Sequence, residues 1–358
     1  MKSSSIKLKL YCNHIRIGDN KLESKDLLEE AKEIHKESII IDAHCDTILH
    51  AAPRIGRYGW KPRSIIERSD RGHIDLPRLI EGGVTCQFFA IYVDAIYKPL
   101  KATERALELI TILYEEVEKS NGKMFIVDKS RDIIQAKKEG KVAALISFEG
   151  GEPIQFNPII LRMFHKLGLR AISLTWNERN MLADGVGEER TKGGLTNIGI
   201  KALEEIKRLR ILLDVSHLSE SGFWDIIENY DMPIIASHSN SKHICNHRRN
   251  LTDEQLKAIA EKNGVVGINF CPSFIVEEGK PTIEDLIKHI DHMDKVMGVN
   301  HIGLGSDFDG IPSTPIGLED VSKLPKLTAS LLEHGYSKVD IKKILGENFL
   351  RIISEVVG

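Results

Sequence analysis

The stretch "IIIDAHCDT", residues 39–47, is an apolar run that ends in side chains able to bind metals. Successive side chains of a strand point to opposite faces, so His44 and Asp46 share one side and Cys45 takes the other. We expect Cys45 to be a small buried apolar residue. A strand that simply ends in polar residues and continues into a loop, without any metal site, would show the same sequence pattern. Partner ligands elsewhere in the chain must therefore decide whether a metal site begins here.

Eight apolar runs of strand length alternate with helix-like segments along the chain. They are SIIIDAH (38–44), VTCQFFAIYV (84–93), KVAALISF (141–148), RAISLT (170–175), ILLDVS (211–216), PIIASH (233–238), GVVGINF (264–270) and HIGLGSD (301–307). Helical patterns cover 103–120, 198–210 and 252–263, the last with Thr252 as a plausible N-cap. Continuous apolar strands between helices indicate a parallel sheet covered on both faces.

Eight such units predict an α/β fold, a closed (β/α)8 TIM-like barrel with long loops at the C-terminal strand ends. The alternative is an open doubly wound sheet, which needs a glycine-rich phosphate turn after the first strand. The segment AHCDTILHAAP, residues 43–53, is not such a turn. We expect residues 1–25 to form an N-terminal extension and residues 26–358 to form the single barrel domain.

Composition and charge exclude several classes of protein. The net charge of −3 comes from 49 basic and 52 acidic residues, which gives no electrostatic reason to expect nucleic acid or an anionic membrane as a partner. No apolar stretch of about 18 residues predicts a membrane span, and neither end resembles a secretory or lipid-anchor signal. We therefore expect a cytoplasmic protein.

The five cysteines are scattered without a C-x-x-C pair, which argues against a disulfide framework or a thiolate zinc cluster.

Metal-binding side chains recur at the C-terminal ends of the predicted strands. They are His44 and Asp46 after the first strand, Glu149 after the third, His217 after the fifth, His238 after the sixth, and Asp307 with Asp309 after the eighth. These ends converge on one mouth of a barrel. Three imidazoles and several carboxylates suit zinc or another borderline divalent ion, and they exceed the needs of one tetrahedral site. They fit two metals about 3.5–4 Å apart that share a carboxylate.

Seven other histidines, in loops and helices, lack partner spacing, so we expect them to be solvated or satisfied locally. They are His50, His73, His165, His243, His247, His289 and His292.

Five segments in this order resemble the membrane (renal) dipeptidase family of zinc peptidases, within the amidohydrolase superfamily. They are "DAHCDT", "SFEGG", "DVSHLS", "IASHSNS…NHRRN" and "GLGSDFDG", and the resemblance spans about residues 38 to 310. It implies a zinc dipeptidase that acts on dipeptides with a free C-terminal carboxylate through a metal-bridging hydroxide. Members of the family are commonly homodimers, which makes a homodimer possible here.

The resemblance also implies a role for each matching residue. One zinc ion would be bound by His44 and Asp46, a second by His217 and His238, and Glu149 would bridge the two. Asp307 matches the acid/base aspartate of the family. Arg249, the second arginine of "HRRN", matches the residue that holds the substrate carboxylate.

One position departs from the family pattern. After the fourth strand the mammalian enzymes carry "LTH", and that histidine helps to hold the scissile carbonyl oxygen. This chain reads "SLTWN", with Trp176 in that place. An indole N–H can donate one hydrogen bond but carries no positive charge. Trp176 is thus either a substitute donor toward the substrate or a wall of the pocket.

Two other functions fit parts of this pattern. Another metal-dependent amidase or lactonase of the superfamily would carry H-x-H on the first strand and often a modified bridging lysine, whereas this chain has H-x-D and Glu149. A non-catalytic metal-binding protein would have no need of Asp307 or Arg249. The side-chain preference among dipeptides, and the tolerance for a D-residue at the second position, have no signal in the sequence.

Overall fold

The computed structural model of the chain describes residues 24–54 and 61–358. The predicted N-terminal extension, residues 1–25, lies outside the described residues except for its last two, which begin helix α1 (Ser24–Glu37). The boundary between extension and barrel therefore stays a prediction.

Nine parallel strands form one sheet within the described residues. They are β1 (Ile41–Asp42), β2 (Cys86–Tyr92), β3 (Met124–Ile126), β4 (Val142–Glu149), β5 (Leu169–Ser173), β6 (Leu212–Asp214), β7 (Ile234–Ala236), β8 (Val265–Ile268) and β9 (Ile302–Leu304). The sheet closes because β1 pairs with both β2 and β9, and β2 pairs with β4. The eight predicted runs are the eight strands of this closed barrel, so the barrel is confirmed and the open sheet is excluded.

Strand β3 was not predicted. It pairs only with β4, where Met124 lies opposite Val142, and it stands outside the closed ring of eight. A run of three residues carries no period that would separate a strand from a loop.

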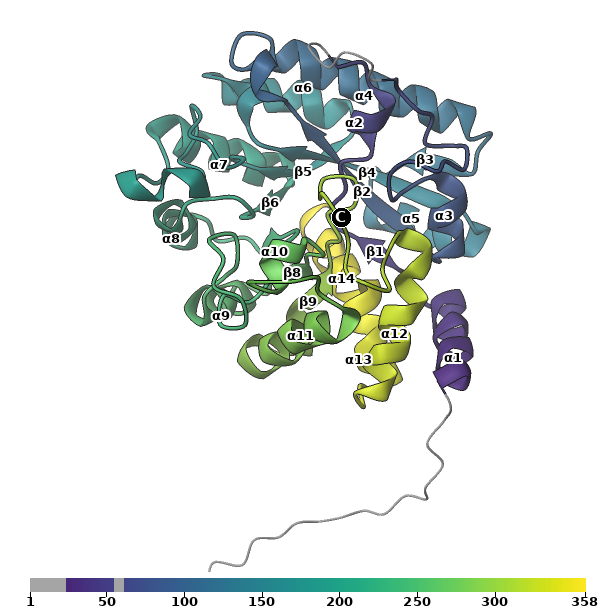
Figure 1. Cartoon of the computed structure of the whole chain (residues 1–358). Coiled ribbons are helices and arrows are strands. Elements are labelled where there is room, and N and C mark those ends of the chain that lie inside the picture. Colours follow the sequence, from purple (N-terminus) through teal and green to yellow (C-terminus); the bar gives the residue numbers. More distant parts are fainter. Residues whose placement is uncertain (1–23, 55–60) are drawn as a thin grey trace, which may run out of the picture.

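Helices surround the barrel (Figure 1). They are α1, α2 (Ile48–Ala51), α3 (Leu76–Glu81), α4 (Ala102–Lys119), α5 (Ser130–Glu139), α6 (Leu161–Lys166), α7 (Asn197–Leu209), α8 (Glu220–Asn229), α9 (Asp253–Glu261), α10 (Pro272–Ile275), α11 (Ile283–Met297), α12 (Leu324–Glu333), α13 (Lys338–Lys342) and α14 (Asn348–Val356). The predicted helices are confirmed as α4, α7 and α9. No helix in the described part of the chain has the length and apolar character needed to cross a bilayer.

The predicted N-cap of α9 is also confirmed. The hydroxyl of Thr252 accepts a hydrogen bond from the backbone N–H of Gln255, and the Gln255 side chain accepts one from the backbone N–H of Thr252. This capping box satisfies two backbone donors that the helix leaves unpaired, and it fixes where α9 begins.

Helix α14 closes the N-terminal end of the barrel. Its Phe349, Ile352 and Ile353 are fully buried in one cluster with residues from the beginnings of the strands, such as Ile41 and Cys86. Figure 1 shows this yellow helix in the middle of the ring of strands. Burial of each such side chain stabilises the fold by about 1.5–3 kcal/mol. The opposite end, where the strands finish, is left for the site.

Two glycines let β7, β8 and β9 approach closely beside the predicted ligands. A Cβ atom on Gly267 would lie 2.1 Å from the carbonyl oxygen of Ser237, and one on Gly305 would lie 1.8 Å from it. Both distances are far below van der Waals contact, so only glycine fits at either place. Gly305 belongs to "GLGSDFDG", and this close approach brings His238 and Asp307 to the same mouth.

Candidate metal centre

The five side chains predicted as ligands meet at the C-terminal mouth of the barrel. His44 Nε2 lies 3.6 Å from Asp46 Oδ2 and 3.7 Å from Glu149 Oε1. The same Glu149 oxygen lies 2.9 Å from His217 Nε2 and 3.8 Å from His238 Nε2. All five residues are buried. Glu149, the last residue of β4, thus stands between one pair from the first strand end and a second pair from the ends of β6 and β7.

Local backbone geometry positions the ligands that follow the first and fifth predicted strands. β1 ends at Asp42, and the chain past it is held by a bridge between Cys45 and Phe308. Cys45 is fully buried, as predicted. His217 has a φ of 68°, in the left-handed region. That conformation costs a non-glycine residue about 1 kcal/mol or more, and such strain gathers at functional sites.

The δ nitrogens of His217 and His238 are both engaged away from the centre. His217 Nδ1 lies 2.9 Å from Asn177 Oδ1, an atom that can only accept. His238 Nδ1 lies 2.7 Å from Ser237 Oγ, whose own proton goes to Asp214 Oδ2 at 2.5 Å. Both δ nitrogens therefore carry the ring proton and donate. Each ε nitrogen is then unprotonated and has a free lone pair. Those ε nitrogens lie 2.8 Å apart, so a proton or a metal ion must sit beside them.

His44 supplies a third imidazole whose ε nitrogen is available for a ligand. Nε2 is buried and has no hydrogen-bond partner among the residues that the structure describes. Burial alone would lower the pKa of His44, but the charges of Glu149, Asp46 and Asp307 outweigh it and raise the pKa to about 10. Three carboxylates packed around one imidazole therefore stabilise a positive charge next to His44. Nitrogen and oxygen donors in this combination fit zinc.

Asp307 lies beside these ligands with its carboxylate held by neighbours. Asn269 Nδ2 donates a hydrogen bond of 2.9 Å to Oδ2, and the Asp307 backbone N–H donates to the carbonyl of His44. Removal from water, opposed by the charge of His44 and reinforced by that of Asp46, raises the pKa of Asp307 to about 6. A carboxyl group with this pKa can accept and return a proton near neutral pH.

Asp309, the other acid of "SDFDG", does not join the metal ligands. Its carboxylate is fully buried and takes hydrogen bonds from Arg63 Nη2 at 3.0 Å, Thr47 Oγ1 at 2.8 Å and the backbone N–H of His73 at 2.5 Å. Asp309 therefore ties the long loop after β1 to the loop after β9.

Arg249 is buried at the edge of the centre, whereas the adjoining Arg248 is exposed. The guanidinium of Arg249 donates a hydrogen bond of 3.2 Å to the carbonyl of His238 and lies 5.6 Å from the Phe274 ring. Its Nε is buried, and no atom in the described part of the chain forms a hydrogen bond with it. Both arginines line the cavity, but only Arg249 is held in place beside the ligands.

A cavity of about 740 Å³ opens over the ligands. Trp176 lies in its wall, with its ring 5.9 Å from that of His217 and 5.3 Å from that of Tyr92. The Lys98 ammonium group lies 5.8 Å from the centroid of the Trp176 ring. Trp176 thus occupies the pocket wall next to a predicted ligand.

The structure adds residues that the sequence did not indicate. Asn177, Ser237, Asp214 and Asn269 orient ligands or the candidate acid/base group, and Tyr92 lines the cavity. The only signal for these asparagines was their place near strand ends, Asn269 directly after β8 and Asn177 in the loop after β5, and such places also suit any loop residue.

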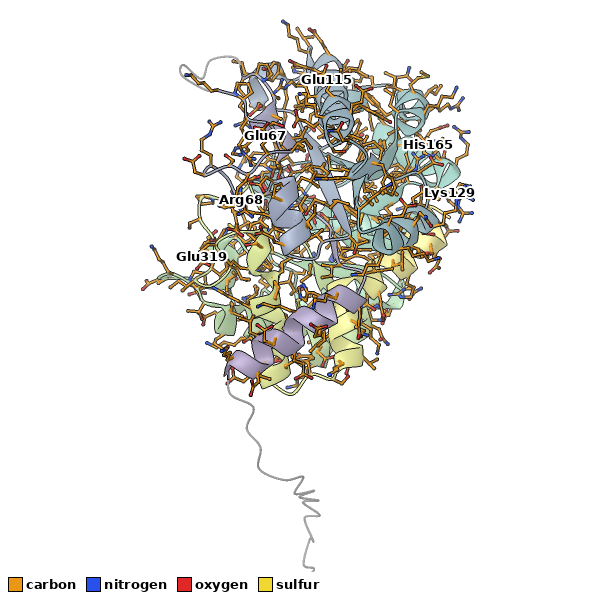
Figure 2. All side chains as sticks on the ribbon, turned by 90° about the vertical axis from the view of Figure 1, so that its right-hand side faces the viewer. Glu67, Arg68, Glu115, Lys129, His165 and Glu319 are labelled. Carbon is orange, nitrogen blue, oxygen red and sulfur yellow. The ribbon has the colours of Figure 1, made fainter. Side chains whose placement is uncertain are left out.

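Most of the other histidines are solvated or satisfied locally, as predicted. The ring of His289 is fully buried between the Ser241 N–H and the Ile275 carbonyl. His165 lies on the outside of the molecule, on α6 (Figure 2). His50 and His247, however, line the cavity, which the sequence did not indicate.

Comparison with known proteins adds independent evidence. The family model of the membrane dipeptidases, peptidase family M19, matches residues 28–357. Dipeptidase tcpJ of Claviceps purpurea is 32% identical over 80% of this chain and 69% of its own length. An uncharacterized dipeptidase of Schizosaccharomyces pombe is 34% identical over 92% of this chain and 83% of its own.

Solved structures with similar folds include two metallopeptidases. One, from Rhodobacter sphaeroides, was solved with a phosphinate mimic of the dipeptide L-Ala-D-Ala. It is 30% identical, with a TM-score of 0.81 over 89% of this chain and 99% of that one. The other is dipeptidase AC of family M19, which is 32% identical, with a TM-score of 0.81 over 90% of this chain and 99% of that one.

Proposed function

The chain belongs to the membrane dipeptidase family of metallopeptidases, and on that premise we propose that it hydrolyses dipeptides with a free C-terminal carboxylate, using two zinc ions. Family membership makes it a metal-dependent hydrolase. The number of ions, the bridging role of Glu149 and the roles of single residues are the parts that we propose.

One observation carries the proposal of two ions. Glu149 Oε1 lies within 4 Å of three histidine ε nitrogens that come from three different strand ends. A carboxylate in that position can bridge one ion held by His44 and Asp46 and another held by His217 and His238. When bound, such a pair of ions supplies an activated water and polarises the scissile carbonyl.

Asp307 supplies the proton transfers in this proposal. Its carboxylate accepts the proton of the attacking water and returns it to the leaving amine. The hydrogen bond from Asn269 fixes the orientation of the carboxylate. A pKa raised to about 6 lets the group work in both directions near neutral pH.

Arg249 supplies recognition of the substrate. A buried guanidinium beside the metal ligands presents charged donors to a carboxylate, and its Nε has no partner within residues 24–54 and 61–358. A dipeptide bound at Arg249 through its carboxylate places the scissile bond one residue away from that contact. A tripeptide in the same pose would place a different bond there, so this contact also sets the length of the substrate.

Trp176 shapes the wall of the cavity and can donate at most one hydrogen bond to a substrate. Its ring packs beside the His217 ring in the cavity wall, where it can shield the centre from water. We assign it to substrate binding, as a wall residue with one donor to offer.

A dipeptide library assayed with zinc-loaded protein tests the proposed function. L,L-dipeptides, dipeptides with a D-residue at the second position, tripeptides and C-terminal amides should be compared at equal concentrations. We expect hydrolysis of free dipeptides and poor hydrolysis of tripeptides and amides. Turnover of N-acyl amino acids or lactones without any dipeptide cleavage would favour the amidase alternative instead.

The homodimer and the cytoplasmic location stay predictions. Sedimentation of the full chain tests the first, and fractionation of cells that produce it tests the second.

A further inference from the structure

Three metal-binding side chains meet on the outside of the barrel, away from the centre. The ring of His243 stacks on that of His292, with centroids 4.2 Å apart and planes 5° apart. His292 Nε2 lies 2.8 Å from Asp253 Oδ1. Among the residues that the structure describes, three groups of histidine, cysteine or carboxylate side chains bring ligand atoms within 4.8 Å of one another. The other two groups belong to the centre described above.

We propose that His243, Asp253 and His292 form a separate site for a borderline divalent transition metal such as Zn²⁺. Two imidazoles and one carboxylate are the donor set that such ions prefer, with a fourth position left for water. Ligand atoms that share one tetrahedral zinc ion lie about 3.3 Å apart, so the 2.8 Å contact of Asp253 Oδ1 with His292 Nε2 would open by about 0.5 Å to admit an ion.

The exposure of the three residues suits reversible binding. His243 is exposed, so its ring can turn from stacking beside His292 to pointing toward an ion. The side chains of His292 and Asp253 are 13% and 32% exposed, so an ion can reach both from solvent. The ordinary role of Asp253, a negative charge in the first turn of α9, does not account for two histidines stacked beside it.

Two of the three ligands, His243 and Asp253, lie near the two ends of one loop. Residues 239–251 run from the end of β7 to the N-cap of α9 and carry Arg249. His243 lies where the loop leaves the barrel, and Asp253 lies just past its return. The backbones of the two arms already pair, since Leu251 N–H donates to the Asn240 carbonyl and Lys242 N–H to the Leu251 carbonyl.

Helix α11 holds this loop from outside. Its His289 accepts a hydrogen bond from the Ser241 N–H, and one turn later His292 contacts both His243 and Asp253. Helices α9 and α11 lie next to each other at the lower left of the molecule (Figure 1). A metal at this place would therefore tie both arms of the Arg249 loop to α11, and we expect it to stabilise the folded chain.

The test counts ions taken up beyond those that the centre retains. Full-length protein is loaded with zinc, dialysed exhaustively, and then titrated with Zn²⁺ by equilibrium dialysis at pH 7.5. We expect wild type to bind one additional ion. His243→Gln and Asp253→Asn should weaken that binding at least about tenfold, because each removes one of three ligands. His165→Gln changes a histidine on the outer helix α6, which lies apart from α9 and α11 in Figure 1, so it is the matched control and should bind as wild type does.

The melting temperature is the second readout. Added zinc should raise it in wild type and in His165→Gln, and the shift should be lost in His243→Gln, because an ion that binds only the folded state stabilises that state. His243 is exposed, so its replacement leaves the core intact. Absence of further uptake by wild type up to about 1 mM zinc overturns the proposal. Equal uptake by all the variants overturns it as well.

Discussion

The ε nitrogens of His217 and His238 lie 2.8 Å apart, although 21 positions separate the residues in the chain and they follow different strands. Both rings are fixed from behind, His217 by Asn177 and His238 by Ser237. Two lone pairs held face to face repel each other unless a cation lies beside them. This contact therefore favours a bound metal ion at the mouth of the barrel over a cluster of polar groups alone.

Metal content is the first expected outcome. Exhaustively dialysed protein should hold close to two zinc ions per chain by elemental analysis, and chelation should abolish hydrolysis. His217→Ala should remove most of one ion and leave the other, because His44 and Asp46 remain. Full activity in a preparation without metal would rule out this mechanism.

Asn177 offers a test of the orientation of His217. Asn177→Ala removes the acceptor for Nδ1, so zinc affinity should fall by about 10–100-fold. Asn177→Asp restores an acceptor and should recover most of the affinity, since a carboxylate is a common partner of metal-bound imidazoles. Competition with a chromogenic chelator measures the affinity directly. Equal affinity in all three proteins would mean that Asn177 does not position His217.

Asp307 should affect turnover without affecting metal binding. Asp307→Asn keeps the shape of the side chain and the contact with Asn269 but cannot carry a proton. We expect kcat to fall by roughly 10²–10⁴ while both ions stay bound. Stopped assays with elemental analysis of the same sample separate the two effects, and near-normal kcat would remove Asp307 from the mechanism.

Asp309, two residues further on, is the control for Asp307. Asp309→Asn weakens a buried ion pair with Arg63, so the free energy of unfolding should fall by about 3 kcal/mol or more. Asp307→Asn should leave that free energy much closer to wild type. Urea denaturation of both variants shows whether the two acids differ in this way.

Arg249 and Arg248 form a matched pair for substrate recognition. Loss of a charge-assisted contact costs about 1.5–3 kcal/mol, so Arg249→Ala should lower kcat/KM for free dipeptides by roughly 10–150-fold. Arg249→Lys should recover it only in part, because an ammonium group lacks the two-pronged contact. The exposed Arg248, changed to Ala, should have a much smaller effect.

The C-terminal amide of the same dipeptide sharpens the test of Arg249. Wild type should prefer the free dipeptide strongly, and Arg249→Ala should lose most of that preference. A ratio of kcat/KM that does not change between the two proteins would show that Arg249 does not recognise the carboxylate.

Two buried histidines predict loss of stability in mild acid. Burial lowers the pKa of both His35 and His289 to about 4, against an ordinary value of 6.5. The unfolded chain therefore takes up protons first, so stability is complete above about pH 6.5 and falls as the pH drops toward 4. Each should contribute about 2 kcal/mol of loss between pH 6.5 and 5.

Urea denaturation across that pH range checks this expectation. His35→Gln should flatten the dependence relative to wild type, even though the variant is less stable at every pH. The comparison between the two proteins isolates His35 from carboxylates and metal ligands that titrate in the same range. Parallel curves for the two proteins would contradict the assignment.

The sequence by itself determined the barrel and the kinds of ligand. Continuous apolar runs with intervening helices are local patterns, and each of the eight runs became a barrel strand. Strand ends are also local features, so His44, Glu149 and His238 could be placed at one mouth once the barrel was assumed. The resemblance in five short segments then identified the family that the full-length match shows.

Only the tertiary structure decided which of two neighbours is held inside, and by which contacts. The residue types alone do not separate Arg248 from Arg249 or Asp307 from Asp309, because adjacent polar residues in a loop carry no period that tells inside from outside. The family resemblance pointed to Arg249 and Asp307 but gave no physical reason for either. Packing against distant segments made the choice: Arg63 and Thr47 hold Asp309 away from the ligands, and Phe274 with the His238 carbonyl holds Arg249 beside them. The orienting partners Asn177 and Ser237, and the outer group around His292, depend in the same way on contacts between segments far apart in the chain, which no local pattern encodes.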